Sequence, residues 1–215
     1  MIISSARNYV FVHIPKTGGT ALTLALEGRA AKDDILIGDT PKAQKRKRRL
    51  ANLTPSGRLW KHSTLADIDG IVSADELAEM FCFTLVRNPW DRVVSYYHWL
   101  REQGFDHPAV ELAKTLEFEP FVRHVDTVTA FRNSPAAHYM TDAAGRERCD
   151  AYVRIECLRQ DLKPLEAHLG FELTVGRVNR SERADDYRSY YDDDLAEFVG
   201  ALCADDIARF GYTFE

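Results

Sequence analysis

The sequence has few cysteines and no long apolar run, and each shortage excludes a class of protein. The four cysteines among 215 residues form no CxxC pair and no zinc-ligand spacing, which excludes a disulfide scaffold and a zinc finger. No segment approaches the ~18 apolar residues of a membrane helix, and residues 1–5 lack the pattern of a signal peptide. Cys82 and Cys203 lie among apolar residues and are expected to be buried free thiols, so we expect a cytoplasmic protein without a membrane span.

The charge is slightly acidic and unevenly distributed. The chain has 28 Lys plus Arg against 33 Asp plus Glu, a net charge of −5. This charge excludes a general nucleic-acid coat, because phosphate neutralisation dominates such binding, but it does not exclude a local anion site. Six of the eight residues in 42–49, the basic island, are Lys or Arg. Hydrophobic residues make up 45%, enough for a core. We expect one domain over residues 1–215, with 29–58 as a basic, partly helical excursion and a candidate mobile segment.

Short apolar runs alternate with helical patterns along the chain. This alternation predicts an α/β, P-loop-like, three-layer fold with a central parallel sheet flanked by helices. Thr20 is expected to cap the first helix, and Ser73 with Glu76 forms a capping-box pattern. The expected strands span 9–14, 81–86 and 152–155, with a short extended piece at 59–64; the expected helices span 21–27, 73–80, 90–102, 158–169 and 192–210, with shorter ones between 105 and 140.

The first chemical motif is the link between strand 9–14 and the next helix. A Gly-Gly turn at a helix start points backbone N–H groups into one cup, and the helix dipole adds positive charge there. Lys16 adds a full charge, and Thr17 and Thr20 add hydroxyls, so the motif is typical of a phosphate or sulfate cradle. It differs from a Walker loop, whose lysine follows the second glycine, and no Mg²⁺-binding Asp is evident. The alternative is an ordinary strand-to-helix turn with a solvent lysine.

The second motif follows strand 81–86. Arg87 stands where the carboxyl end of a parallel strand meets the ligand crevice of open α/β sheets. Ser95 follows about two helical turns later, so one anion could bridge the Arg87 guanidinium and the Ser95 hydroxyl. The alternative is an arginine that binds helix carbonyls and a serine on a helix surface.

Together the two motifs resemble sulfotransferases that use 3′-phosphoadenosine 5′-phosphosulfate (PAPS), most closely the Golgi-type carbohydrate sulfotransferases and their bacterial relatives. The resemblance rests on FVHIPKTGGTAL at 11–22, FTLVRNPWDRVVSYYHW at 83–99, YVRIECLRQDL at 152–162 and the C-terminal stretch 178–214. The chain departs from the family at Ile155, where phenylalanine is expected. It departs again at Ala136 and Ala137, where a glutamine is common. The second departure weakens any inference about the acceptor.

The resemblance implies a set of donor-binding residues. Lys16 would also neutralise charge on the leaving group, whose product is adenosine 3′,5′-bisphosphate, and no metal is expected. Arg87 and Ser95 would bind the 3′-phosphate. Arg180 and Ser181, in a basic loop with Arg177 and Asn179, are further donor-contact candidates, with a solvated loop as the alternative. The residues implied for the 5′-phosphosulfate are Lys16, Thr17, Gly18, Gly19, Thr20 and Ala21.

The resemblance also implies a base between the two motifs, and His62 is the candidate. An imidazole titrates near neutrality and can accept a hydroxyl proton, although a surface or hydrogen-bonded histidine is the alternative. The competing histidines are His13, expected to pack under the loop, and His98, three residues after Ser95; the others are His107, His124, His138 and His168. The implied acceptor is a carbohydrate or another small hydroxylated molecule. Trp60, Trp99, Tyr96 and Tyr97 are candidates for stacking on sugars, although aromatic residues at helical spacing are more often core.

Two other functions stay open. A P-loop-like nucleotide kinase would need a Mg²⁺ ligand set and a Walker-type lysine. A non-catalytic module would use the basic island to bind an acidic glycan. The island itself is interpreted either as a solvated helix face or as a flexible flap that attracts an acidic acceptor or covers the donor. The sequence does not indicate an oligomeric state.

Overall fold

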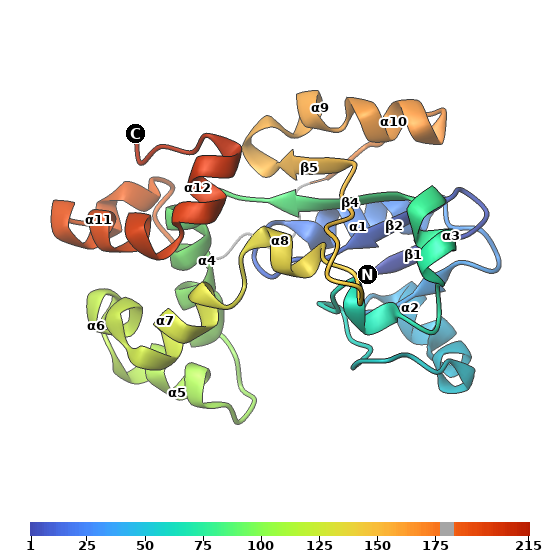
Figure 1. The fold of residues 1–215 in the computed structure, drawn as a ribbon. Coiled ribbons are helices and arrows are strands. Elements are labelled where there is room, and N and C mark those ends of the chain that lie inside the picture. Colours follow the sequence, from blue (N-terminus) through green and yellow to red (C-terminus); the bar gives the residue numbers. More distant parts are fainter. Residues whose placement is uncertain (177–182) are drawn as a thin grey trace. The chain divides into compact units, whose positions relative to one another are not determined.

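The computed structural model describes residues 1–176 and 183–215 (Figure 1). The chain divides into two compact units. Unit 1 comprises Met1–Val86 and Ala136–Val178, and unit 2 comprises Arg87–Pro135 and Asn179–Glu215. The first motif and His62 belong to unit 1, whereas Arg87 and Ser95 belong to unit 2.

Unit 1 contains a five-stranded sheet in the order β3-β1-β2-β4-β5. The parallel pairs β2–β4 and β4–β5 confirm the predicted core of the sheet. The sheet as a whole is mixed, which corrects the parallel-sheet prediction, because β1 pairs antiparallel with both β2 and β3. β1 and β2 form a hairpin whose tight link includes Asn8 at φ 53°. The strands are β1 (Ile2–Ser4), β2 (Tyr9–Val12), β3 (Ile35–Leu36), β4 (Phe81–Val86) and β5 (Ala151–Arg154).

Helices cover both faces of this sheet, as the three-layer prediction requires. Phe11 and Phe83 join Leu22 of α1 and Leu165 of α10 in one buried cluster. On the opposite face the Cys82 thiol lies 3.9 Å from the Leu77 carbonyl of α3. The α-helices of unit 1 are α1 (Gly19–Gly28), α2 (Pro41–Arg46), α3 (Ala74–Glu79), α8 (Ala136–Tyr139), α9 (Leu158–Asp161) and α10 (Lys163–Leu169). The 3₁₀ turns are η1 (Lys47–Asn52), η2 (Ala66–Ile68) and η3 (Ile155–Cys157).

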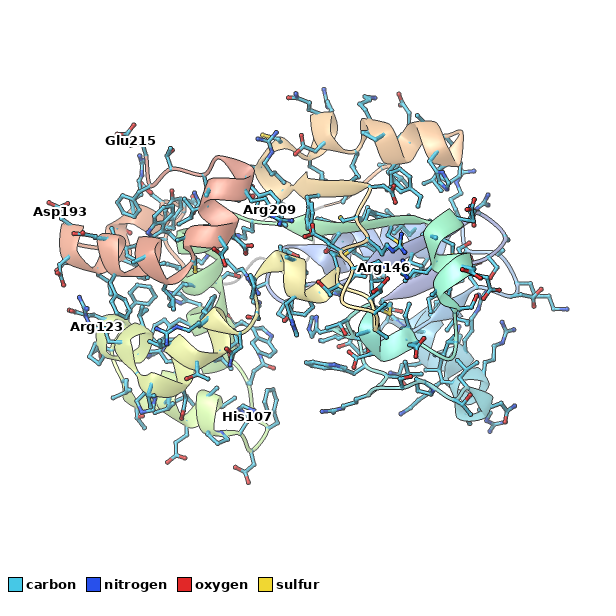
Figure 2. All side chains as sticks on the ribbon, in the orientation of Figure 1. His107, Arg123, Arg146, Asp193, Arg209 and Glu215 are labelled. Carbon is cyan, nitrogen blue, oxygen red and sulfur yellow. The ribbon has the colours of Figure 1, made fainter. Side chains whose placement is uncertain are left out.

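Unit 2 is helical in its described part and packs around α4. Trp90, Val93 and Tyr97 of α4 are buried against Phe121 of α6 and Val199 of α11. On the surface Arg123, labelled in Figure 2, pairs with Glu119 and Asp194. The elements are α4 (Pro89–Arg101), α5 (Pro108–Thr115), α6 (Phe118–Arg123), α7 (Val125–Arg132), η4 (Tyr187–Tyr190), α11 (Asp193–Leu202) and α12 (Ala204–Phe210). None of the helices in the described ranges is both long and apolar enough to cross a bilayer.

Several local predictions are confirmed and others are wrong. The capping box of Ser73 and Glu76 is present. Thr20 does not cap α1, because Gly18 is the N-cap residue in left-handed conformation. The helix expected over 158–169 is interrupted at Leu162, and Pro164, which has no backbone N–H, lies in the first turn of the new helix α10. The helix expected over 192–210 is interrupted at Cys203, and no strand forms at 59–64.

The structure also tests the predictions for the cysteine thiols and for the excursion 29–58. All four cysteines are free; Cys82 is buried as predicted, whereas Cys203 is only partly buried. Burial raises the pKa of the Cys203 thiol to about 11 and that of the Cys82 thiol to about 12. The excursion 29–58 contains β3, α2 and η1, so part of it belongs to the sheet and the helical layers.

Candidate functional site

The loop after β2 has an unusual backbone. Lys16 has φ 67° and Gly18 has φ 81°. A lysine at positive φ is uncommon and indicates a local constraint. Turns that contain left-handed residues direct successive N–H groups to one side and form anion-binding cups. The Thr17 hydroxyl donates to the Ile14 carbonyl at 2.9 Å, so Thr17 closes the turn.

The two glycines are required by close packing as well as by φ. A Cβ on Gly18 would lie 2.2 Å from the Ile155 Cδ1 atom. A Cβ on Gly19 would lie 2.2 Å from the His13 Cδ2 atom, so the His13 ring packs directly under the start of α1 as predicted. A helix leaves its first N–H groups without intrahelical partners; in α1 the Ala21 N–H donates to the Gly18 carbonyl at 3.2 Å, and the first turn has no acidic residue. The loop therefore has the geometry of an anion cradle, with Thr20 and Ala21 in the first turn of α1.

His62 lies against the strand end that leads into this loop. Its Nδ1 atom is 2.7 Å from the His13 carbonyl oxygen, and the two imidazole rings meet edge to face with centroids 4.8 Å apart. Burial lowers the pKa of His62 to about 4, with Lys61 lowering it further and the bond to the His13 carbonyl opposing the shift. Burial likewise places the pKa of His13 well below its usual range, with His62 adding to the effect. Both rings are therefore neutral at neutral pH.

The hydrogen bond of His62 also assigns its tautomer. A carbonyl oxygen only accepts, so the Nδ1 atom must bear the proton that forms this bond. The lone pair of the neutral ring is then on Nε2. This tautomer leaves Nε2 as the ring atom that can accept a proton, although a pKa of about 4 makes His62 a weaker base than an ordinary imidazole.

Trp60 is the one stacking candidate that is exposed. Its side chain is 41% exposed, and its ring meets the His62 ring edge to face at 5.0 Å. The Arg58 guanidinium lies 5.3 Å from the Trp60 ring centroid. Tyr97 is buried, and Tyr96 and Trp99 pack against the core of unit 2. The exposed indole, a cation and the candidate base therefore form one surface of unit 1.

The second motif forms the start of α4 in unit 2. The Asn88 side chain accepts hydrogen bonds from the backbone N–H groups of Trp90 and Asp91 and caps the helix. Arg87 Nη2 lies 2.6 Å from the Asp91 carboxylate, one turn further along. Ser95 lies one more turn along and is 5% exposed. Asp91 and Ser95 therefore share one side of the helix, and Arg87, just before its N-cap, pairs with the first of them.

Four of the remaining histidines, His98, His107, His124 and His168, have contacts of their own. His107, labelled in Figure 2, and His124 accept hydrogen bonds from backbone N–H groups at the starts of α5 and α7. His168 Nε2 lies 2.9 Å from the Arg7 carbonyl. His98 packs edge to face on Tyr190 in unit 2. Within unit 1 the described contacts therefore favour His62 over these alternatives.

The basic island divides into two halves. Lys42 binds the carbonyl of Glu27 in the last turn of α1. Arg46 and Arg49 bind carbonyls beyond the helix, with Arg46 2.8 Å from the Ala31 oxygen. Lys42 thus places a positive charge at the negative end of α1. Lys45, Lys47 and Arg48 are exposed.

Some predicted residues lie outside the described ranges, and some contacts were missed. Arg180 and Ser181, with Arg177 and Asn179, fall in residues 177–182 and are not described. Sequence reasoning missed Asp91, although its spacing four residues after Arg87 predicts an ion pair. It also missed Arg183, which pairs with Asp91 from a distant part of the sequence. Among the described residues no group of three or more His, Cys, Asp or Glu is placed to hold a metal ion.

Comparison with known proteins identifies the family of the chain. The model of the sulfotransferase family, Sulfotransfer_2, matches residues 1–213. No curated protein matches the chain. Among solved structures, the chain is similar to the crystal structure of mouse sulfotransferase SULT7A1 complexed with PAP, at 14% identity and a TM-score of 0.48, covering 95% of this chain and 85% of that chain. This structural likeness is too weak to extend what the sheet topology shows.

Proposed function

The chain belongs to the sulfotransferase family, and we propose that it transfers the sulfuryl group of PAPS to a hydroxyl or amine of a carbohydrate acceptor. The observation that carries the proposal is the backbone of the loop between β2 and α1. Lys16 and Gly18 have positive φ there, and Gly18 is the N-cap residue of α1. A sulfuryl donor is an anion, and this loop offers it backbone donors, a helix N-terminus and one ammonium group. The family match over 1–213 supports one catalytic domain over 1–215.

Each end of the donor has a proposed binding segment. The 5′-phosphosulfate binds the loop from Lys16 to Ala21. The 3′-phosphate binds Arg87, which directly precedes the N-cap of α4, and Ser95, which lies on that helix. A guanidinium forms paired hydrogen bonds to phosphate oxygens, and a serine hydroxyl adds a third donor. Arg180 and Ser181 remain candidates for further donor contacts.

The chemical step divides between Lys16 and His62. Bound PAPS supplies a sulfuryl group attached to a phosphate leaving group. His62 Nε2 accepts the proton of the acceptor hydroxyl as the acceptor oxygen bonds to sulfur. Lys16 and the loop N–H groups neutralise the charge on the bridging oxygen as its bond to sulfur breaks. Because an ammonium group and backbone dipoles do this work, the proposal needs no metal.

The carbohydrate acceptor is supported by Trp60. An exposed indole beside the candidate base offers a flat apolar face, which suits the C–H face of a sugar ring. The Arg58 cation over the same ring favours a sugar that bears a carboxylate or sulfate group. A Trp60→Ala variant should raise the acceptor KM about ten-fold, about the contribution of one stacked ring, with little change in the donor KM.

A PAPS-dependent activity screen over neutral, amino and acidic glycans tests the function. Transfer of labelled sulfate to any glycan supports it, and its absence with every acceptor would favour the non-catalytic module. Isothermal titration separates the kinase alternative, because adenosine 3′,5′-bisphosphate should bind without Mg²⁺. Binding of Mg·ATP in preference to the bisphosphate would overturn the proposed donor.

A further inference from the structure

The Asp91 carboxylate lies between two arginines. Arg87 Nη2 and Arg183 Nη2 each lie 2.6 Å from it, one on either oxygen. The two arginine side chains are 14% exposed and the aspartate 18%. Two guanidinium groups therefore share one carboxylate, at a place where water screens their charges little. Arg123 shows the opposite arrangement, because it pairs with two carboxylates that are more than half exposed.

Among the described residues, this cluster contains one buried donor atom without a hydrogen-bond acceptor. Arg183 Nη1 is buried and has no hydrogen-bond partner among the described residues. Buried polar groups almost always have partners, so such an atom needs an explanation. A guanidinium with one edge on Asp91 and an unsatisfied nitrogen is suited to bind an anion with that nitrogen.

Arg183 is not needed to hold the C-terminal segment on α4, because other hydrogen bonds attach the segment that follows it. The Asn88 side chain lies 3.3 Å from the Tyr187 hydroxyl. The Tyr191 hydroxyl donates to the Trp90 carbonyl at 2.9 Å. Trp90 Nε1 in turn donates to the Ala196 carbonyl at 2.8 Å. These bonds hold the C-terminal segment on α4 without Arg183.

We propose that Arg183 binds the same phosphate as Arg87 and Ser95, and that Asp91 is a positioning residue that holds both guanidinium groups. Asp91 and Ser95 lie one turn apart on α4, about 6 Å along the axis. Arg87 precedes Asn88, the N-cap residue of this helix, and its side chain reaches Asp91. An anion that spans Arg87 and Ser95 therefore passes Asp91, where Arg183 is attached. The ligand is a phosphate monoester, which has three oxygens to accept from two guanidinium groups and a hydroxyl. The inference rests on the proposed function and assigns this phosphate to the 3′ position of the donor.

Titration calorimetry with two nucleotides tests the proposal. Adenosine 3′,5′-bisphosphate contains the phosphate in question, and adenosine 5′-monophosphate lacks it. Arg183→Gln should weaken bisphosphate binding about ten- to a hundred-fold, as expected for a lost hydrogen bond to a charged group. It should leave monophosphate binding within about two-fold. Equal weakening of both ligands, or of neither, would overturn the proposal, because a structural arginine does not distinguish them.

Three further variants sharpen the test. Arg183→Lys keeps the charge but not the fork and should restore only part of the lost affinity. Asp91→Asn should also weaken bisphosphate binding, because the arginines lose their anchor; tighter binding would show that Asp91 only repels the phosphate. Arg188→Gln removes an exposed pair with Asp186 in the same segment and should change neither affinity. If the unaltered protein binds both nucleotides equally, the proposed donor fails and this inference fails with it.

Discussion

The loop of unit 1 and the α4 cluster of unit 2 are both suited to anions, but they are built from different parts of the chain. The loop relies on backbone N–H groups whose directions follow from positive φ at Lys16 and Gly18. The α4 cluster relies on side chains, namely Arg87, Asp91 and Arg183. Backbone donors cannot change rotamer, so they suit the group whose charge changes during reaction. Side-chain donors are individually replaceable, so they suit recognition of one particular phosphate.

The two regions also differ in how charge is handled. Beside the loop, burial keeps His13 and His62 neutral, whereas the α4 cluster holds three ionised groups in contact. A neutral imidazole can accept a proton, and an ion cluster can bind a fixed charge. We therefore expect substitutions near the loop to lower turnover and substitutions in the cluster to weaken donor binding.

The largest expected effect is that of Lys16→Ala. Loss of the one full charge that the loop adds should lower kcat about 10²- to 10³-fold, as for the loss of one transition-state donor. The affinity for adenosine 3′,5′-bisphosphate should fall far less, because the α4 contacts remain. Steady-state kinetics and calorimetry measure the two, with Lys163→Ala, an exposed lysine paired with Glu166, as control. If Lys16→Ala lowers only the donor affinity and leaves kcat unchanged, the expected difference between the loop and the α4 cluster is wrong.

His62→Gln should lower kcat about a hundred-fold with unchanged bisphosphate affinity. The pH profile tests the same residue. With a pKa of about 4 instead of 6.5, His62 keeps its base form down to about pH 4. The unaltered enzyme should therefore show no loss of kcat/KM near pH 6.5 from this group, and should lose activity only as pH approaches 4. Full activity in His62→Gln would exclude His62 as the base.

The elements around these sites were predictable to different degrees. β2, β4 and α4 have strong apolar patterns, and the chain forms them close to the expected bounds. β1 and β3 have three and two residues, too few for a period, and β1 is specified by its pairing with β2. The break of the C-terminal helix at Cys203 has no proline or glycine at that residue to indicate it.

The site shows the same contrast between local and distant signals. The glycines and Lys16 follow one another in sequence, so the loop could be predicted from local conformational rules. The contact between His62 and the His13 carbonyl joins residues 49 positions apart. The pairing of Arg183 with Asp91 also joins distant residues. Tertiary packing decides such contacts, and no local spacing encodes them.

Gly19→Ala should have an intermediate effect. Its Cβ would overlap the His13 ring at 2.2 Å, so the ring or the start of α1 must move. Bisphosphate affinity should fall about ten-fold, and the free energy of unfolding should fall by about 1–3 kcal/mol, as for overpacking in a core. Gly28→Ala is the matched control, because nothing lies within 4 Å of its Cβ position. If Gly19→Ala and Gly28→Ala change bisphosphate affinity and the free energy of unfolding equally, contact with the His13 ring does not constrain the loop.

A smaller effect concerns stability in acid. The folded-state pKa of His62 is about 4 and its ordinary value is 6.5, so between these values the unfolded chain binds more protons. The contribution to stability is complete above about pH 6.5 and falls as the pH approaches 4. Urea unfolding across this window should show a shallower loss of stability in His62→Gln than in the unaltered protein. An equal slope would indicate that His62 is not held neutral by burial.

The smallest expected effect divides the basic island. Replacing the exposed Lys45, Lys47 and Arg48 by glutamine should raise the KM of an acidic acceptor about two- to three-fold at low salt, with no change at high salt where such attraction is screened. Replacing Lys42, Arg46 and Arg49 instead removes bonds to backbone carbonyls. That second variant should lower the melting temperature by a few degrees, because each carbonyl loses its cation. An unchanged acceptor KM in the first variant would mean that Lys45, Lys47 and Arg48 only form a solvated surface. A raised acceptor KM in both variants would mean that the whole island attracts the acceptor.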